Sequence, residues 1–369
     1  MSRWYAQVPK ATPDENRQYR LDLLREAAGS DAVQAYLIDA CRDDVLFYLN
    51  AFVYTFDPRL TGEKMVPFTT FPIQDYGIRQ IEASITTGRD LVIEKSRDLG
   101  ATWMCLSVCE HRWHFHKDQT FMCLSRNADA VDGKKNEDSL FSKIDRIHRR
   151  LPIWLMPKGW NQRQHRNTMA FFNPENYCTI NGGATVTDAG VGGRRTAIFI
   201  DEFSRIPEGY EIDLGTADVT NCRIFNFTAY GKNNAAYELL KNKYKKKIRL
   251  HWSSDPRKNA KLYKWDAELQ RYKYFRFSDA TLTLEECDAH QYDATDHDRK
   301  NFDEDSGYPD GRPFEPIPAG ILRSPVYDSE DTRRGNRKYM AINWDIDYEG
   351  SDDHFFDLKM LLEYERDIA

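Results

Sequence analysis

The 369-residue sequence lacks long apolar runs. None approaches the roughly 20 consecutive apolar residues that a helix needs to span a bilayer. The first residues include Arg3 and Lys10 but no apolar stretch, which is not the pattern of a secretory signal peptide. We therefore expect no membrane association and a cytoplasmic location.

Cysteine pairs with metal-ligand spacing are also missing. The seven cysteines are scattered along the chain, and no two of them form a Cys-x-x-Cys pair. Several lie inside apolar runs, where a free cysteine behaves as a small hydrophobic residue. We interpret them as reduced core residues and expect no structural zinc site.

An overall excess of positive charge is absent too. The formal net charge of -6 argues against a protein coated in basic residues, so any contact with nucleic acid must come from a local patch. Residues 241–264 are the most basic stretch. Its cations can meet DNA phosphates or simply be solvated, and both readings stay open: Lys243, Lys245, Lys246, Lys247 and Arg249.

The apolar patterning divides the chain into three parts. Residues 1–60 predict an N-terminal helical region, because apolar positions between 13 and 56 recur at helical spacing. Residues 61–240 predict an α/β core, and residues 241–369 a small lid or linker subdomain with an acidic loop. In the core, a helix over 73–85 precedes short apolar strands at 90–94, 119–125, 196–200 and 223–227.

Apolar strands separated by helices or long connections favour a mainly parallel sheet covered on both faces. Such a sheet places a ligand site at the carboxyl ends of its strands. Between the second and third strands, residues 177–180 and 184–187 flank Asn181-Gly182-Gly183, which reads as a hairpin added to the sheet.

The first strand leads directly into a short polar loop and then a helix. This order presents backbone N–H groups and a helix dipole to phosphate. Gly100 and Thr102 stand where a phosphate-binding loop has its second glycine and its Mg²⁺-binding hydroxyl, although Ala101 replaces the usual lysine. The candidate ATP-binding residues of the loop are Lys95, Ser96, Arg97, Asp98, Leu99, Gly100, Ala101 and Thr102.

Two cations of this loop are candidates for contact with the phosphates. Lys95 can reach the β- and γ-phosphates from the start of the loop, because a lysine stem is long and flexible. Arg97 can stabilise the γ-phosphate as an arginine finger supplied in cis. The alternative is an ordinary glycine-containing turn between a strand and a helix, with solvated charges.

A second element follows about 100 residues later, where the strand at 196–200 ends in two adjacent carboxylates. Asp201 can hold Mg²⁺, and Glu202 can polarise the attacking water as general base. An Asp-Glu pair after a strand can also be only a helix cap. The upstream loop favours the catalytic interpretation.

Two further residues complete the candidate site. Thr228, after the strand at 223–227, can bond the γ-phosphate or the attacking water, although any strand exit also contains such residues. Gln74 opens the helix before the first strand, and its amide carries the donor and acceptor that adenine requires. A surface glutamine is the alternative.

The order of these four elements resembles the large subunit of phage terminases, the ATP-driven motor that packs DNA into proheads. Some members of that family carry the loop lysine at its start, as Lys95 does here. The stretches 56–59, 125–132 and 192–195 also resemble the family, so the resemblance covers roughly residues 45–350.

The resemblance implies a RecA-like P-loop ATPase of the ASCE class with a small second subdomain. It implies ATP and Mg²⁺ as cofactors, and double-stranded DNA, the portal protein of the prohead and the terminase small subunit as partners. It also implies a homo-oligomeric ring docked at the portal in the host cytoplasm. A neighbouring subunit then supplies an arginine, for which Arg126, Arg149 and Arg150 are candidates.

The family further implies a nuclease of RNase H-like fold, of which the chain holds no convincing copy. Asp345 and Asp347 alternate along an expected short strand, but we interpret them as the end of the small second subdomain. We therefore expect ATPase activity and no endonuclease activity from this chain.

Two other functions remain open. A helicase of the Asp-Glu-box type uses similar chemistry, but it needs a second RecA-like domain, which residues after about 240 do not offer. A catalytically weak nucleotide-binding scaffold is the other alternative, and Ala101 in the lysine position favours it.

Overall fold

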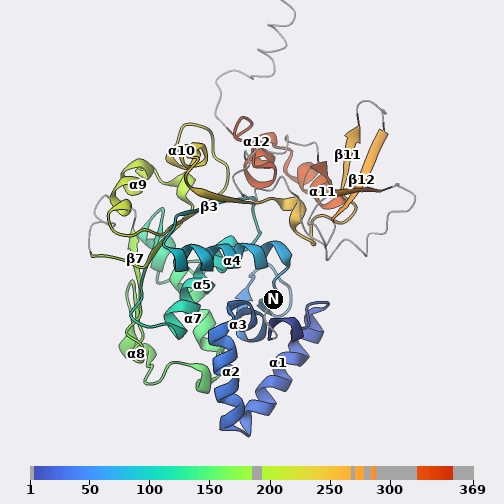
Figure 1. The fold of residues 1–369 in the computed structure, drawn as a ribbon. Coiled ribbons are helices and arrows are strands. Elements are labelled where there is room, and N and C mark those ends of the chain that lie inside the picture. The colour runs from blue at the N-terminus through green and yellow to red at the C-terminus, as the bar shows by residue number, and fades with distance from the viewer. Residues whose placement is uncertain (1–3, 185–192, 267–270, 278–283, 288–321, 352–369) are drawn as a thin grey trace, which may run out of the picture.

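A computed structural model describes residues 4–184, 193–266, 271–277, 284–287 and 322–351 (Figure 1). Its central feature is an eight-stranded sheet with the order β10-β3-β9-β8-β4-β7-β6-β5. Pairs from β10 to β7 are parallel, and the last two pairs are antiparallel. The strands are β3 (Leu91–Lys95), β4 (Thr120–Ser125), β5 (Arg166–Asn167), β6 (Ala170–Phe172), β7 (Thr179–Ala184), β8 (Ala197–Asp201), β9 (Arg223–Phe227) and β10 (Lys246–Leu250).

The strands of this sheet are apolar along their whole length because both faces of the sheet are buried. In β3, Leu91 and Ile93 face one hydrophobic cluster, and Val92 between them faces another. Burial on both faces explains why the parallel strands read as continuous apolar runs. The four strands predicted from the sequence are confirmed as β3, β4, β8 and β9, as is the mainly parallel sheet with helices on both faces.

Helices cover the two faces of the sheet separately. One face packs against α4 (Pro72–Thr87), α5 (Ala101–Phe115) and α7 (Leu140–Arg150), and the other against α9 (Gly209–Ala217) and α10 (Ala235–Lys241), as Figure 1 shows. The helix predicted over 73–85 is therefore confirmed as α4. Among the described residues, no helix combines the length and apolar character that crossing a bilayer requires.

The N-terminal region is helical, as the sequence predicted. It forms α1 (Pro13–Ala28), α2 (Asp31–Asp43) and α3 (Val45–Phe52), which pack below α5 and α7. Each begins at a side-chain cap, because Thr12, Ser30 and Asp44 accept hydrogen bonds from the first turn. A short pair, β1 (Tyr54–Phe56) with β2 (Met65–Pro67), then leads to α4.

The predicted hairpin at Asn181-Gly182-Gly183 is wrong. These residues lie inside β7, paired in parallel with β4, and residues 185–187 lie outside the described part of the chain. Gly182 is needed for close packing: an added Cβ would stand 2.7 Å from the Met169 sulfur and 2.7 Å from a methyl of Val131, in α6 (Ala128–Asp132). Glycine inside a strand therefore marks a close approach rather than a turn.

The large sheet also continues past residue 240, where the sequence predicted the core to end. β10 pairs with β3, and its Arg249 is buried with Nε 2.8 Å from the Glu94 carboxylate. Lys245 donates to Asp90 at 2.5 Å. These two cations therefore hold the sheet edge together, so the reading of them as DNA-contacting residues is wrong.

A smaller antiparallel sheet and helices follow the large sheet. Its strands are β11 (Tyr263–Asp266), β12 (Arg271–Phe277), β13 (Leu284–Cys287) and β14 (Leu322–Arg323), followed by α11 (Pro325–Arg334), α12 (Arg337–Met340) and a helical turn, Ala341–Asp345. The short strand expected around Asp345 and Asp347 is wrong. Asp345 ends the helical turn and accepts a hydrogen bond from the Tyr327 hydroxyl at 2.9 Å.

Candidate functional site

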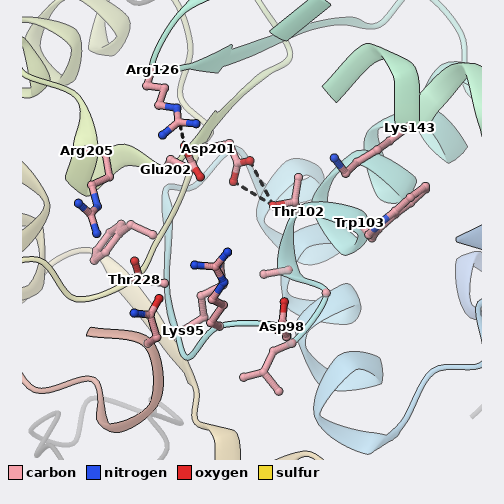
Figure 2. A pocket seen from close by; sticks show the side chains of 16 residues that line it. Lys95, Asp98, Thr102, Trp103, Arg126, Lys143, Asp201, Glu202, Arg205 and Thr228 are labelled. Atoms are coloured by element: carbon pink, nitrogen blue, oxygen red, sulfur yellow. Dashed lines mark hydrogen bonds and ion pairs between the residues drawn. The ribbon is translucent and has the colours of Figure 1, made fainter. Parts of the chain in front are cut away.

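The carboxyl ends of β3, β8 and β9 surround a cavity of about 520 Å³, which we call the loop cavity (Figure 2). The sheet order brings these three ends together, although they lie far apart in the sequence. Sixteen residues line the cavity: Lys95, Arg97, Asp98, Leu99, Gly100, Ala101, Thr102, Trp103, Arg126, Lys143, Asp201, Glu202, Arg205, Phe227, Thr228 and Asn343. Of the predicted site residues, only Ser96 and Gln74 do not line it.

The loop between β3 and α5 turns through two left-handed residues, Asp98 (φ 63°) and Gly100 (φ 74°). Gly100 is the N-cap of α5 and supplies no side-chain cap, so the first N–H groups of the helix lack intrahelical acceptors. Among the described residues, the N–H groups of Ala101, Thr102 and Trp103 have no hydrogen-bond acceptor. The helix therefore begins with donors available to an anion in the cavity.

Gln74 lies behind this loop. Its Nε2 donates to the Leu99 carbonyl at 3.1 Å, and its Oε1 accepts from the Phe71 N–H at 3.3 Å. An added Cβ on Gly100 would stand 2.9 Å from Gln74 Nε2, so a side chain there would push the two apart. Gln74 thus supports the loop, and its predicted contact with adenine remains a prediction.

Thr102 and Asp201 meet across the cavity. The Thr102 hydroxyl lies 3.2 Å from both carboxylate oxygens of Asp201, and Asn226 Nδ2 donates to Asp201 Oδ1 at 2.5 Å. Burial raises the pKa of Asp201, against the opposing effects of the Lys95 charge and the Asn226 hydrogen bond. A hydroxyl and a carboxylate in this position are oxygen ligands of the kind Mg²⁺ takes.

Lys95 ends β3 at the floor of the cavity and is partly buried. Burial lowers the pKa of its ammonium, while the charges of Asp201 and Glu202 act in the opposite direction. Among the described residues, neither the Lys95 ammonium nor the Arg97 guanidinium has a hydrogen bond or an ion pair. Both cations are therefore available to a ligand.

The charges around the cavity favour an anionic ligand. Five cationic side chains face three carboxylates, an excess of two positive charges: Lys95, Arg97, Arg126, Lys143 and Arg205 against Asp98, Asp201 and Glu202. A net excess of charge of one sign in a cavity raises the local concentration of ions of the opposite sign. A polyphosphate bound with a divalent cation matches this balance.

Glu202 follows β8 in a left-handed conformation, with φ at 53°. For a residue other than glycine this conformation is uncommon and often marks a functional site. The turn leaves the Glu202 carboxylate exposed at the cavity, where its Oε2 lies 3.1 Å from Nε of Arg126. Glu202 can therefore contact water inside the cavity once that pair opens.

Thr228 follows β9, the strand between β3 and β8. Its carbonyl accepts a hydrogen bond from Ser204 Oγ at 2.8 Å, which ties the end of β9 to the turn after Glu202. The structure thus brings Thr228 beside the carboxylate pair, as the sequence predicted.

Ser96 faces away from the cavity. Its hydroxyl donates to the Trp344 carbonyl at 2.5 Å and accepts from the Trp252 N–H at 3.0 Å. The Arg97 N–H donates to the Asn343 carbonyl at 2.7 Å, and Lys258 Nζ donates to the Arg97 carbonyl at 2.6 Å. Segments near 250–258 and 343–344 therefore fix the back of the loop.

Burial lowers the pKa of Lys258 to about 8, although the carboxylates of Asp255 and Asp98 oppose this shift. The carboxylate of Asp98, which belongs to the loop itself, is paired with Arg59, whose guanidinium donates to Asp98 Oδ2 at 3.0 Å. Burial alone would raise the pKa of Asp98, but the hydrogen bond and charge of Arg59 outweigh it and lower the pKa.

Sequence reasoning missed Lys143, Arg205 and Asn343. Lys143 comes from α7, and Figure 2 shows its ammonium on the side that faces Thr102, where it also donates to the Asp138 carbonyl and lies 3.8 Å from Asp138 Oδ1. Burial lowers the pKa of Lys143, and the charge of Asp138, followed by those of Asp201 and Glu202, opposes that shift. No motif marks these three residues, because only the fold brings them to the cavity. The six cysteines with described side chains are all buried and unpaired, as predicted.

No protein-family model matches the chain, and a search of curated proteins also finds no match.

Proposed function

We propose that this chain is a magnesium-dependent P-loop ATPase and the motor part of a terminase large subunit, which translocates double-stranded viral DNA into the prohead. The observation that carries the ATPase proposal is the contact of Thr102 with Asp201 beside Lys95, whose ammonium has no partner among the described residues. A hydroxyl at the helix start, a strand-end carboxylate and a loop cation are the groups that hold a metal-bound triphosphate.

Each residue has a role that follows from its place. The N–H groups at the start of α5, with Lys95 and Arg97, hold the phosphates, and Thr102 and Asp201 hold the Mg²⁺. The metal ion, when bound, neutralises charge on the phosphate oxygens. Glu202 orients and polarises the attacking water as general base, and Thr228 bonds the γ-phosphate or that water.

The strand order supports the RecA-like ASCE class. β9 lies between the loop strand β3 and the carboxylate strand β8, so Thr228 ends between Lys95 and Asp201. An inserted strand separates the phosphate loop from the carboxylates and leaves room between them for the γ-phosphate and a water molecule. Among the described residues after 250, the strands form only a small antiparallel sheet, which argues against a helicase with a second parallel domain.

DNA packaging rests on the order of the sequence motifs and on their resemblance to terminases. This part of the proposal includes double-stranded DNA, the portal protein and the terminase small subunit as partners. It places the chain in a homo-oligomeric ring at the portal in the host cytoplasm. Arg149 and Arg150 are exposed at the end of α7 and so remain candidates for the arginine supplied to a neighbour. Arg126 pairs with Glu202 of its own chain.

The decisive experiment measures ATP turnover of the whole chain and of the Glu202→Gln variant, with and without Mg²⁺. We expect turnover that requires Mg²⁺ and falls by at least about a hundredfold in the variant, while ATP binding persists. Exchange of the exposed Glu208 for Gln is the matched control and leaves turnover unchanged. Mg²⁺-dependent ATP binding without turnover in the parent chain contradicts the motor and supports the scaffold alternative.

A further inference from the structure

Three consecutive carbonyl groups of the loop between β3 and α5 accept hydrogen bonds from side chains that stand outside the loop cavity. The three pairs are Lys258 Nζ with the Arg97 carbonyl at 2.6 Å, Arg257 Nη2 with the Asp98 carbonyl at 2.9 Å, and Gln74 Nε2 with the Leu99 carbonyl at 3.1 Å. The three donor residues do not line the cavity. The carbonyl groups that they hold therefore point away from it.

The direction of these carbonyl groups sets the direction of the N–H groups that follow them. A trans peptide group is planar and carries its C=O and the next N–H on opposite sides, so a carbonyl turned away from the cavity turns the following N–H toward it. The N–H groups after the Arg97 and Leu99 carbonyls are those of Asp98 and Gly100, and neither has an acceptor among the described residues. They extend the row of donors that begins α5.

The loop sequence by itself does not favour this orientation. The chain turns at Arg97 and Asp98, and Asp98 has a left-handed φ of 63°. In such a turn the peptide group between the two central residues is flipped relative to the commonest turn type, and glycine is the usual residue in the place of Asp98. Another residue keeps this conformation only where its surroundings hold it. Lys258 and Arg257 hold the peptide groups on the two sides of Asp98.

The two cations stand on a fixed turn that follows β10. Asp255 is fully buried, and its carboxylate accepts hydrogen bonds from both the backbone N–H and the guanidinium of Arg257. The Lys258 N–H donates to the Asp255 carbonyl at 2.8 Å, and the Lys258 carbonyl accepts from Ser324 Oγ at 2.6 Å. Lys258 Nζ also lies 4.9 Å from the centre of the Trp344 ring. Both donors are therefore in place before a ligand binds, which lowers the cost of ordering the loop.

We propose that Lys258 is a positioning residue of the loop, which holds the Arg97 carbonyl outward so that the Asp98 N–H points at the phosphates of the bound nucleotide. The inference rests on the proposed ATPase function and adds to it a residue that no motif marks. Because the ammonium is charged, its hydrogen bond also polarises the peptide group and makes the Asp98 N–H a stronger donor. Arg257 supports the same turn, and Gln74 has the corresponding role for the Gly100 N–H.

The Lys258→Met variant tests this role, because it keeps the stem beside Trp344 and removes the donor. We expect its affinity for ATP to fall by about tenfold in EDTA and by the same factor with Mg²⁺, since the loss lies at the phosphates and not at the metal. In turnover, KM should rise by that factor while kcat changes by less than about twofold. Lys258→Arg keeps a charged donor and should recover most of the affinity. Exposed Lys261→Met makes the same charge change nearby and should bind ATP like the parent chain.

Tripolyphosphate probes the backbone donors directly, because it has no base or sugar. In a proton–nitrogen correlation spectrum of the parent chain, we expect it to shift the amide proton resonances of Asp98 and Gly100 downfield. The Lys258→Met variant should lose the shift of Asp98 and keep that of Gly100, since the carbonyl before Gly100 is held by Gln74. Equal shifts of Asp98 in the two proteins overturn the inference.

Affinity equal to that of the parent chain in Lys258→Met also overturns it, because the contact then only fastens the segment after β10. A loss confined to Mg²⁺ has the same consequence, because Lys258 then acts on the metal. If Lys258→Met does not fold, Arg257→Met removes the other support of the turn; several-fold weaker ATP binding is expected there, and unchanged binding overturns the inference.

These binding measurements need no turnover, so they decide on Lys258 even if the chain hydrolyses no ATP. Binding of ATP and tripolyphosphate with the expected effect of Lys258→Met, but without hydrolysis, contradicts the motor and supports the positioning role. Hydrolysis by a Lys258→Met variant with the KM of the parent chain contradicts the positioning role alone. A parent chain that binds neither ATP nor tripolyphosphate overturns both proposals.

Discussion

The hydroxyl of Thr102 lies 3.2 Å from each carboxylate oxygen of Asp201, although the two residues are 99 positions apart in the sequence. Thr102 lies at the start of α5 and Asp201 at the end of β8, so the contact joins the loop between β3 and α5 to the end of β8. A divalent ion placed beside both groups is held by the two elements at once. The proposed site therefore predicts that metal binding and nucleotide binding depend on each other.

The Asp201→Asn variant should separate metal binding from nucleotide binding. We expect the variant to lose about 10- to 100-fold in nucleotide affinity when Mg²⁺ is present and little in EDTA, because only the metal contact is weakened. Isothermal titration calorimetry under both conditions measures the difference. Thr102→Ser keeps the hydroxyl and is the control. An equal loss with and without Mg²⁺ would mean that Asp201 supports the loop rather than the metal.

Lys143→Met should lower turnover more than affinity. Lys143 lines the cavity from α7 on the side that faces Thr102 (Figure 2), and its ammonium donates to the Asp138 carbonyl. A cation there stabilises charge that develops on the phosphoryl oxygens, so we expect kcat to fall by about 10- to 100-fold. Steady-state kinetics measure kcat and KM separately. Exposed Lys135→Met makes the same charge change nearby, and comparable losses in both variants would contradict a local role.

The sequence allowed most residues that line the loop cavity to be predicted, because these residues stand at or after strand ends. Lys95, Asp201 and Thr228 each end or follow a buried apolar strand, and parallel strands bring their carboxyl ends to one edge. Local spacing was enough to find these residues. Lys143 and Asn343 could not be found in this way, since they reach the cavity from other layers.

The wrong predictions from the sequence, at Gly182 and Arg249, share one physical cause. Gly182 suggested a turn, but packing against Met169 and Val131 determines its place inside a strand. Arg249 suggested a solvated cation, yet it is buried because Glu94 on the adjacent strand neutralises it. In each case a tertiary contact outweighed the local preference of the residue.

Gln74→Ala distinguishes the two roles of this glutamine. The structure places its amide on the Leu99 carbonyl, where it supports the loop, whereas the motif order predicts contact with adenine. From the contact we expect several-fold weaker binding of ATP and GTP alike, because the loss of one buried hydrogen bond loosens the loop for both. Competition titrations with the two nucleotides measure the ratio. Exposed Gln164→Ala is the control, and a loss confined to ATP would establish the adenine contact.

The last prediction concerns a buried carboxylate far from the cavity. Glu110 on α5 accepts hydrogen bonds from the Tyr48 hydroxyl at 2.7 Å, and ring nitrogens of His114 and His148 lie 3.0 and 3.2 Å from it. Burial would raise the pKa of Glu110, but these hydrogen bonds and the two histidines outweigh it and lower the pKa far below 4.5. The cluster joins α3, α5 and α7, which form the helical layer on one face of the sheet.

A carboxyl whose pKa is lower in the folded state stabilises the fold above its unfolded pKa, and loses that contribution as the pH falls toward the folded value. The Glu110 contribution should thus be complete above about pH 4.5 and decline below it. We expect Glu110→Gln to cost roughly 3 kcal/mol at neutral pH, because the variant leaves buried partners unsatisfied. The cost should shrink in acid, where the parent chain also loses its carboxylate.

Urea unfolding of the two proteins between about pH 7 and pH 3 measures this difference. Exposed Glu63→Gln is the control, and it should follow the parent chain throughout, since a solvated carboxylate has little to lose on protonation. If the gap between Glu110→Gln and the parent chain keeps one size over the whole range, the loss comes from packing alone. A gap that closes below pH 4.5 attributes it to the charge of Glu110, because only the ionised form gains from the three donors around it.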